Sequence, residues 1–486
     1  MDNKKTLTPI SLVTSIFKFS IATWVNAAIY GISLILASFL LAPDVYGPFD
    51  LFISASNTLM TIAALGLDHS YIRFYHEPPE GAKDSRNLAA MCMTISMSAL
   101  FAFSLIITLV FPRQISYLFF NGVYYPRLIV LLCVNALFLL LARYFTITYR
   151  MRQDTKMYTL QSVLLQFFTR MFFLVGALVK PDLDTIVAFN VFGLGIFSLA
   201  YFLIQRKTML PKKAEYSKKA FPPLLKYGIA LAPSSVLTYI NTLFSRIYVN
   251  GRLGDLKLGI YSMASTVTLA LSIIQSGFAT FWSAFIFENY KTEQKKIIRI
   301  HDYLMFAVMV LMCLLIMFQH VIFLILGSGY REGETIFAIL LISPMLSIIA
   351  ETTVYGIEIA KKTYYDAIGM ALSVGGNIIF CLLFVDKYGM FGAALSLALS
   401  SLLMFIFRSV LGQHFYKSIG YPAKTIMSLL IIFILCVIAY LFASKPLFVS
   451  LAALIVMAGF CIIYGEQFKR CLALAKQILG MLTKKS

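Results

Sequence analysis

The 486-residue sequence contains few charged residues. Only 13% of its residues are Asp, Glu, Lys or Arg, and 60% are hydrophobic, whereas soluble domains are near half apolar and about a quarter charged. A helix that crosses ~30 Å of hydrocarbon needs ~20 apolar residues, and stretches of this kind recur along the whole chain. The composition therefore excludes a soluble protein and predicts an all-α, multi-pass membrane protein.

Several kinds of chemistry lack the motif they need. No G-x-x-x-x-G-K-[ST] occurs, so the chain has no P-loop to couple ATP hydrolysis to transport. It has no nucleophile elbow, no H-E-x-x-H pair and no clustered metal ligands. The seven cysteines are scattered singly and predict neither a disulfide framework nor a metal site. We therefore expect no enzymatic activity, no metal and no cofactor.

Apolar runs, separated by Gly, Pro or charged residues, divide the chain into about fourteen predicted spans. The first run is too long for a signal peptide and lacks a convincing cleavage site, so we interpret it as a retained transmembrane helix. The spans start near residues 14, 46, 88, 127, 157, 184, 225, 256, 302, 335, 364, 389, 422 and 447.

The basic residues predict the orientation of these spans. If the N-terminus is inside, the inner segments hold thirty Lys and Arg, and two more lie within spans. Cytoplasmic segments of membrane proteins are enriched in Lys and Arg, so we predict fourteen helices with both termini cytoplasmic. The same bias explains the net charge of +19 without nucleic acid, which we do not expect as a partner. Only nine basic residues fall outside: Arg113, Arg127, Lys180, Arg246, Arg252, Lys257, Arg331, Lys387 and Lys445.

The longest polar stretch follows Gln205 and divides the chain near its middle. No loop is long enough to hold a soluble catalytic domain. The predicted parts are an N-terminal six-helix bundle over 1–206, a basic cytoplasmic linker over 207–224, a C-terminal six-helix bundle over 225–415, and two additional transmembrane helices with a basic cytoplasmic tail over 416–486.

The two halves contain a similar turn. "LLAPDVYGPFDLF" from Leu40 and "RLGDLKLGIYSMA" from Arg252 superpose when Gly47 is set on Gly259. This offset also places the first helix on the seventh and the second on the eighth. Many transporters contain internal repeats that rock about a central site, so the match favours a repeated transporter fold.

Three basic residues lie within or at the ends of predicted spans. Arg170 is about twelve residues into the fifth span, which places it ~18 Å deep, near the bilayer midplane. It either ties its helix to a polar neighbour or meets an anionic substrate in a cavity. Lys18, one turn into the first span, is shallow enough to reach the interface. Arg246 closes the seventh span near the outer face, as an anchor or as part of a site.

Three acids also lie within or near predicted spans. Glu351 is about two-thirds of the way through the tenth span, and Glu358 and Asp366 lie nearer the cytoplasm. Because a charge at this depth needs a partner or a wet cavity, any of them could carry a coupling proton or pair with a cation. All three are candidates for gating or ion coupling.

The stretch "GLDHSYIRFYHE" ends the second span on the predicted cytoplasmic side. If the helix continues, His69, Arg73 and Glu77 form one polar stripe, and the aromatic residues between them lie at headgroup level. Most of this cluster then lies at the membrane–water interface, where the helix leaves the membrane. Asp68 lies just inside the boundary, where it could pair across a cytoplasmic gate, and we add Asp68 and Arg73 to the gating candidates.

At several places the residues resemble the polysaccharide-transport family of the multidrug/oligosaccharidyl-lipid/polysaccharide (MOP) flippase superfamily, which includes Wzx-like O-antigen and capsule repeat-unit flippases. The similar stretches, spread over about residues 10 to 410, are "LLAPDVYGPFDLFISASNTLMTIAALGLD", "GLDHSYIRFYHE", "RLGDLKLGIYSMAS", "FATFWSAFIFENYK", "GIEIAKKT" and "GGNIIFCLLFVDKYGMFGAALSLALSSLL". Two places depart from the pattern. "FVDKYG" lacks the Pro that relatives often have before the Gly, and Ser245 stands where relatives often have Asp before the Arg.

The resemblance implies two pseudo-symmetric six-helix bundles, here with two further C-terminal helices, and alternating access of a central cavity. The implied substrate is an undecaprenyl diphosphate-linked oligosaccharide, the repeat unit of a lipopolysaccharide O-antigen, capsule or exopolysaccharide. The implied location is the cytoplasmic (inner) membrane of a bacterium, with membrane lipid and polysaccharide assembly machinery as partners. Because a diphosphate needs charge-assisted donors in a low dielectric, Arg170, Lys18 and Arg246 are the predicted substrate-binding residues.

Two alternatives stay open from the sequence. A MATE-like drug or cation antiporter has the same fold and would favour a cavity dominated by acids, whereas this chain offers both signs. A membrane-embedded polymerase or ligase of lipid-linked sugars would be expected to present a large outer loop with catalytic groups. The predicted outer loops here are short.

Overall fold

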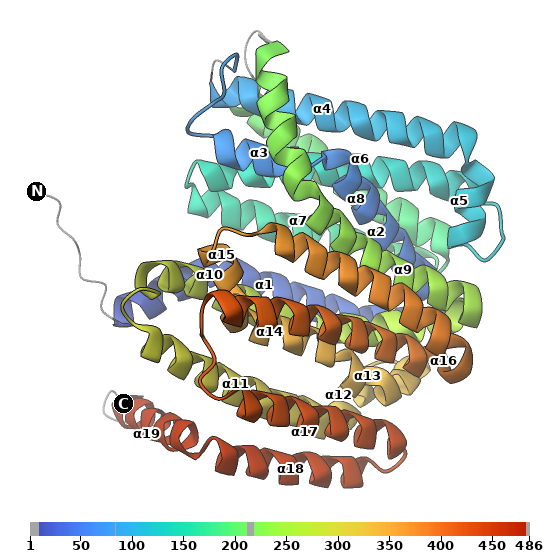
Figure 1. Ribbon diagram of the computed structural model, residues 1–486. Helices are drawn as coiled ribbons and strands as arrows, with labels where there is room; N and C mark the ends of the chain where they lie inside the picture. Colours follow the sequence, from blue (N-terminus) through green and yellow to red (C-terminus); the bar gives the residue numbers. More distant parts are fainter. Residues whose placement is uncertain (1–8, 83, 211–217, 483–486) are drawn as a thin grey trace, which may run out of the picture. The chain divides into compact units, whose positions relative to one another are not determined.

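The computed structural model describes residues 9–82, 84–210 and 218–482 (Figure 1). Every regular element in these ranges is a helix, which confirms the predicted all-α fold. The side chains of residues 9–23 and 474–482 lie outside the described part. The predicted site residue Lys18 is among them.

Ten helical stretches in the described ranges are long and apolar enough to cross a membrane, or eleven if the bent pair α2 and α3 counts as one span. Two of them are too long for one crossing. The stretch Phe221–Asn289 has 69 residues and Tyr364–Phe415 has 52, which correspond to roughly 100 and 80 Å of helix. Their backbones leave helical geometry at Gly254 and Gly389, close to the predicted starts at 256 and 389. The count of fourteen and the side of the termini stay predictions.

The chain forms two compact units, Met1–Met263 and Ala264–Ser486. In the first, α7 packs against both α1 and α8, and α6 lies between α2 and α8. The predicted division into bundles and linker stays a prediction, and residues 211–217 of that linker lie outside the described part. The helices of the first unit are α1 (Pro9–Leu40), α2 (Pro43–Ala64), α3 (Leu67–Phe74), α4 (Ser85–Leu105), the π-helix η1 (Ile106–Val110), α5 (Pro112–Phe119), α6 (Pro126–Met151), α7 (Thr155–Val179), α8 (Leu183–Met209), the 3-10 turn η2 (Lys218–Ala220) and α9 (Phe221–Thr268), which ends in the second unit.

In the second unit, α14 packs on α10, α11 and α16, α17 packs on α11 and α13, and α18 packs on α11 and α17. His301 of α11, fully buried, bonds Thr352 of α14 at 2.8 Å and Thr425 of α17 at 3.2 Å, which ties the C-terminal helices to the rest of the unit. The helices are α10 (Ala270–Asn289), α11 (Gln294–Met317), α12 (Gln319–Ile325), the 3-10 helix η3 (Ser328–Gly333), α13 (Glu334–Leu340), α14 (Ile342–Thr353), α15 (Tyr355–Ile359), α16 (Tyr364–Phe415), α17 (Pro422–Leu441), α18 (Pro446–Ile463) and α19 (Gly465–Leu482).

The starts of several helices follow from local sequence. Asp84, Asp154 and Asp182 each accept hydrogen bonds from backbone N–H groups in the first turn of α4, α7 and α8, which satisfies donors that have no partner within the helix. Proline opens α2, α5, α6, α17 and α18, where its missing N–H costs nothing.

The second predicted span does not continue as one straight helix. Leu65 and Gly66 both have positive φ, and α2 and α3 meet at a bend of 53°. A Cβ on Gly66 would overlap the carbonyl oxygen of Gly228 in α9, so the chain turns where only glycine allows the two backbones to touch. His69 and Arg73, expected on a continuation of the second span, therefore lie on a separate helix, α3, that is bent away from α2.

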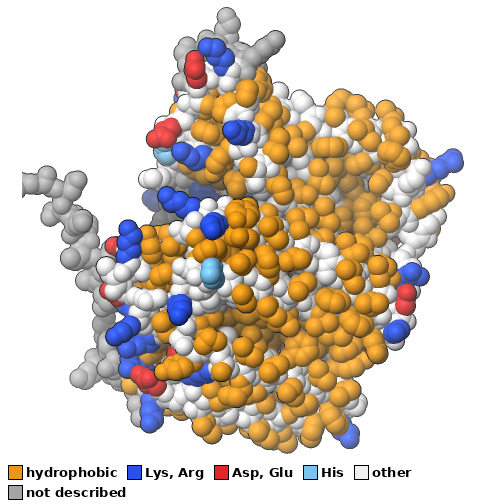
Figure 2. All heavy atoms as spheres, in the orientation of Figure 1, with side chains coloured by type: hydrophobic (Ala, Val, Ile, Leu, Met, Phe, Trp, Pro, Cys, Tyr) orange, Lys and Arg blue, Asp and Glu red, His pale blue; other side chains and the backbone are white. Residues whose placement is uncertain are grey.

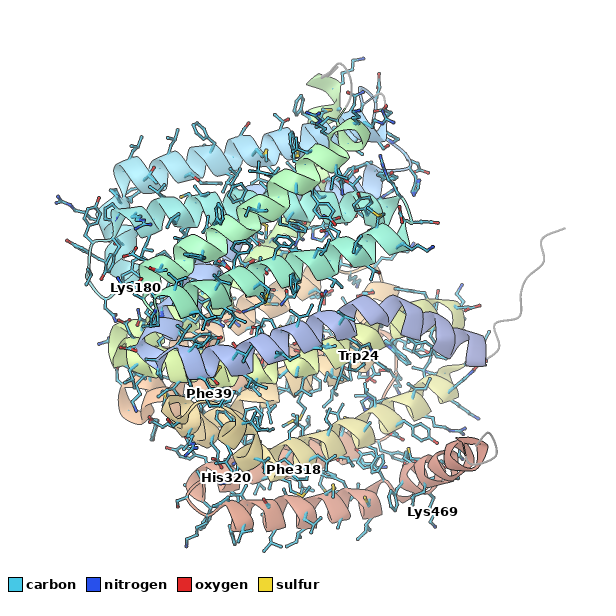
Figure 3. All side chains as sticks on the ribbon, turned by 180° about the vertical axis from the view of Figure 1, so that it is seen from behind. Trp24, Phe39, Lys180, Phe318, His320 and Lys469 are labelled. Carbon is cyan, nitrogen blue, oxygen red and sulfur yellow. The ribbon has the colours of Figure 1, made fainter. Side chains whose placement is uncertain are left out.

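Apolar side chains cover much of the molecular surface, as expected for a protein in lipid. Figure 2 shows hydrophobic side chains over most of the face in view, with charged side chains mainly at its margins. Leu447 and Ile462 of α18 are each 81% exposed. Figure 3 shows Trp24 and Phe39 along α1, and both are exposed. A multi-pass membrane protein explains this surface.

The two units contain an internal repeat that is visible in their hydrogen bonds. Gln205 Nε2 donates to the Phe145 carbonyl at 3.4 Å, and Gln413 Nε2 donates to the Thr353 carbonyl at 3.3 Å. Both members of the second pair stand 208 positions after those of the first. Gln153 and Lys361, also 208 positions apart, both have left-handed backbones, with φ of 58° and 57°. The turn after α6 is thus repeated after α15.

Candidate functional site

A buried ion pair joins α2 and α9 in the first unit. Arg246 Nε donates to Asp50 Oδ2 at 2.5 Å, and the two side chains are only 10% and 16% exposed. Arg246 was expected near the outer face with no acid beside it in sequence. The structure supplies the acid from a helix 196 residues earlier.

The same end of the first unit is closed by backbone contact. A Cβ on Gly47 would lie 2.6 Å from the Gly259 nitrogen, and one on Gly259 would overlap the Pro43 carbonyl. Asn121 Nδ2, from the turn after α5, donates to Asp255 Oδ1 at 2.8 Å and to Asn250 Oδ1 at 3.2 Å. These contacts surround Gly254, where α9 breaks. The two glycines that the sequence aligned as repeat equivalents thus touch each other.

A second ion pair lies at the other end of α2. Arg143 of α6 donates from Nε to Asp68 Oδ2 at 2.6 Å, and its Nη2 also contacts that oxygen. The Asp68 side chain is 4% exposed. With His69 and Arg143 it lines a small pocket that Ala232 and Ser235 of α9 complete. The buried Asp68 carboxylate therefore forms an ion pair with Arg143 of α6. Arg73, which the sequence placed on one stripe with Glu77, contacts the Glu77 carboxylate at 3.4 Å on an exposed surface.

Arg170 of α7 is half-buried and lies over an aromatic ring. Its Cζ is 4.1 Å from the centroid of the Tyr30 ring of α1, a cation–π geometry. The same two helices are joined by Asn26 Nδ2, which donates to Ser162 Oγ at 2.8 Å. Among the side chains that the structure describes, Arg170 has no carboxylate within salt-bridge distance. The positive charge of Arg170 thus rests against the face of the Tyr30 ring and has no acidic counter-ion among the described side chains.

The second unit contains a cavity of about 310 Å³ between α10, α14, α15 and α16. Glu351 and Glu358 both line it, together with Gln275, Tyr355 and Arg408. Gln275 Nε2 donates to Glu351 Oε1 at 3.0 Å.

Asp366 reaches this cavity through Arg408. The Arg408 guanidinium is 2.8 Å from Asp366 Oδ1 through both Nε and Nη2. Two of the acids that the sequence singled out, Glu351 and Glu358, thus line the same cavity as Arg408, and the third, Asp366, is the ion-pair partner of Arg408. Burial, followed by the neighbouring Asp366 carboxylate, raises the pKa of Glu358, which lies between the spans.

The repeat shows what these acids replace. When the turn after α6 is set on the turn after α15, Glu351 falls on Arg143 and Glu358 on Arg150. The first repeat has arginines where the second has glutamates. Arg143 forms an ion pair with Asp68, whereas its equivalent Glu351 accepts a hydrogen bond from the neutral amide of Gln275.

A model of the family described as "Polysaccharide biosynthesis protein" matches residues 12–281, more than half of the chain. The chain belongs to this family. No curated protein sequence matches it.

Solved structures share the fold of this family member. The "Lipid II flippase MurJ, inward closed conformation" is 16% identical with a TM-score of 0.71, over 92% of this chain and 99% of that one. A MATE in complex with MaL6 is 14% identical with a TM-score of 0.56, over 82% and 95%. An outward-facing multidrug resistance MATE family transporter of the MOP superfamily is 16% identical with a TM-score of 0.55, over 82% and 95%. These likenesses confirm a fold like that of MurJ and the MATE structures, and the matched structures are named as a flippase and as transporters.

The family member holds these basic and acidic side chains in different units. Arg170 and Arg246 lie in the first unit, and the carboxylate cavity lies in the second. Within the described residues, no group of three His, Cys, Asp or Glu side chains could hold a metal ion. Carboxyl groups within a membrane protein need a charged partner, a proton or water beside them.

Four residues of these sites were missed from the sequence. Arg143 and Arg408 stand at span ends and were counted with the cytoplasmic basic residues. Asp50 lies four residues into a predicted span, and this depth is the signal that could have found it. Gln275 is uncharged and gave no signal.

Proposed function

We propose that the chain is a flippase that moves an undecaprenyl diphosphate-linked oligosaccharide from the inner to the outer leaflet of a bacterial cytoplasmic membrane by alternating access. The oligosaccharide is the repeat unit of a surface polysaccharide, the class that includes O-antigen, capsule and exopolysaccharide. Assembly machinery on the outer side consumes the product. In this mechanism fourteen helices cross the membrane, and both termini are cytoplasmic.

The observation that carries the proposal is membership of the polysaccharide biosynthesis family together with a MurJ-like fold. The TM-score of 0.71 to the lipid II flippase exceeds the 0.56 and 0.55 to the MATE structures. MurJ is named for flipping a lipid-linked substrate, and a chain of this family that moves a saccharide needs the same kind of passage. The MATE-like antiporter is the weaker alternative.

The free charge of Arg170 supports an anionic substrate. A diphosphate crossing a low-dielectric region requires fixed cationic donors, and Arg170 has no acidic partner among the described side chains. Its guanidinium can keep its contact with the Tyr30 ring while its N–H edge binds phosphate oxygens. Arg246 and Lys18 are the other proposed substrate-binding residues. Arg246 can receive substrate only when Asp50 releases it.

An Arg170→Ala variant tests the proposal. In cells that depend on this chain for surface glycan, we expect the variant to lose most surface glycan at normal protein level, while glycan lipid accumulates on the inner leaflet. Lys180→Ala is the matched control, because it removes a cation that is 72% exposed in the loop between α7 and α8. Normal glycan in Arg170→Ala would contradict the role of Arg170. An unchanged leaflet distribution of glycan lipid when the chain is deleted would overturn the flippase function itself.

A further inference from the structure

The cavity of the second unit has more acidic than basic groups. Glu351 and Glu358 line it, and Arg408, the single cation among its described lining residues, pairs with Asp366. Since Arg408 is held by Asp366 at 2.8 Å, Glu351 and Glu358 have no cationic partner within salt-bridge distance in the described part of the chain. Two unpaired carboxylates in a largely apolar bundle are costly unless a proton or another charge neutralises them.

The first repeat shows that this imbalance is not required by the fold. At the equivalent place Arg143 and Asp68 form a pair, and the pocket beside them is only about 10 Å³, room for about one water. In the second repeat the pair is absent, and the cavity is about 310 Å³, room for several waters. The equivalent place is therefore closed by an ion pair in the first unit, whereas in the second unit it holds a larger cavity lined by acidic side chains.

Glu351 is the acid best placed to hold a proton in this cavity. Gln275 Nε2 donates to its Oε1 at 3.0 Å, which leaves Oε2 available for a proton. Each element packed around it contributes known groups: α15 presents Tyr355 and Glu358, and α16 presents Asp366 and Arg408. On the α11 side, His301 is occupied by Thr352 and Thr425.

We propose that Glu351 takes up and releases one proton in each transport cycle, and that Arg408 shifts from Asp366 toward Glu351 when the proton leaves. The carboxylic acid becomes a carboxylate, its proton passes to water in the cavity, and the guanidinium neutralises the new charge. Asp366 then loses its partner, which couples proton release to the two ends of α16. This assignment rests on the proposed function, for which it supplies the driving ion.

Infrared difference spectroscopy on the full-length protein in lipid nanodiscs tests the proton site without any substrate. Stepping from low to high pH should remove the carbonyl stretch of a protonated carboxylic acid. We expect Glu351→Gln to lack this change, and Glu288→Gln, which removes an exposed acid from α10, to keep it. A change that persists in Glu351→Gln and disappears in Glu358→Gln would overturn the assignment, as would one that persists in both.

The role of Arg408 predicts a shift in the pH midpoint of the same band. Removing a neighbouring cation raises the titration midpoint of a carboxyl group by about 1–3 pH units, so Arg408→Gln should titrate at higher pH, and Arg408→Lys should stay close to the parent. An unchanged midpoint in a folded Arg408→Gln would contradict partner exchange. Because no substrate is present, these results are independent of the Arg170→Ala experiment, and either proposal can fail alone.

Discussion

At the scale of single residues, the pair of Asp50 and Arg246 determines how one predicted substrate contact must operate. A buried charge left without its partner costs about 3–5 kcal/mol, and both side chains are largely buried. Arg246 is therefore both a structural tie and a proposed substrate-binding residue. It binds a diphosphate only by giving up Asp50, so these two roles alternate.

A double-mutant cycle separates the two roles of Arg246. We expect Asp50→Ala to lower stability by roughly 3–5 kcal/mol, because it leaves the Arg246 guanidinium buried and unpaired. The double variant with Arg246→Ala should regain much of this stability. If Arg246 also binds substrate, the double variant stays deficient in glycan export. Thermal unfolding in detergent and surface glycan are the two measurements, and full recovery of both would show that Arg246 is only a tie.

Which residues could be predicted depended on their depth in the spans. Arg170 and Glu351 stood out because ionisable groups are rare within apolar runs. Arg143 and Arg408 sit at span ends, where basic residues are common, so their inward contacts needed coordinates. No sequence pattern shows which way a helical side chain faces when the helix is apolar on most sides.

At the scale of elements, two glycines divide the longest helices. Gly389 has φ of 57° and ψ of −134°, a region that residues with a Cβ occupy only with strain. Nothing lies within 4 Å of where its Cβ would be, so backbone geometry alone demands glycine there. The break lets α16 run out and back, which brings Asp366 and Arg408 together.

Replacing Gly389 tests this reason for the break. We expect Gly389→Ala to destabilise the protein by about 1–3 kcal/mol, the cost of a strained backbone. Gly375→Ala is the control, because Gly375 lies within a helical part of α16, nothing lies within 4 Å of where its Cβ would be, and the variant should be neutral or slightly stabilising. The difference between their melting temperatures is the measurement. Equal values would mean that α16 can continue through residue 389.

The apolar runs predicted most elements but not their internal bends. The starts at 364 and 389 agree with the two arms of α16, because Gly389 interrupts an apolar run in the sequence. The bend at Leu65 and Gly66 lies inside an apolar and small-residue stretch. Its cause is the approach of Gly228 from a distant helix, so local sequence could not show it.

At the scale of the whole molecule, duplication with charge inversion is the main organising feature. Glutamines and left-handed turns recur 208 positions apart, yet arginines of the first repeat become glutamates in the second. The sequence match at Gly47 and Gly259 indicated a repeat. It could not show the inversion, since the equivalence of the later helices became visible only through their hydrogen bonds.

The orientation in the membrane is tested by reporter fusions. With fourteen crossings and both termini inside, a reporter placed after Lys213 should be cytoplasmic and one after Arg331 external, because basic residues favour the cytoplasmic side. Within the second unit, Figure 3 shows His320 and Lys469 at opposite ends of the helices, as this topology requires. Enzymatic reporters active on only one side give the measurement, and reversed activities would overturn the orientation.

In the first unit, α2 and α9 touch through glycines near both ends of α2, Gly47 with Gly259 and Gly66 with Gly228. A contact between two backbones cannot adapt by a change of rotamer as a contact between long side chains can, so each of these contacts is either formed or broken. A methyl group introduced at one end acts as a wedge for that end alone. In the proposed alternating-access mechanism, substitutions at these two glycine pairs are expected to trap opposite access states.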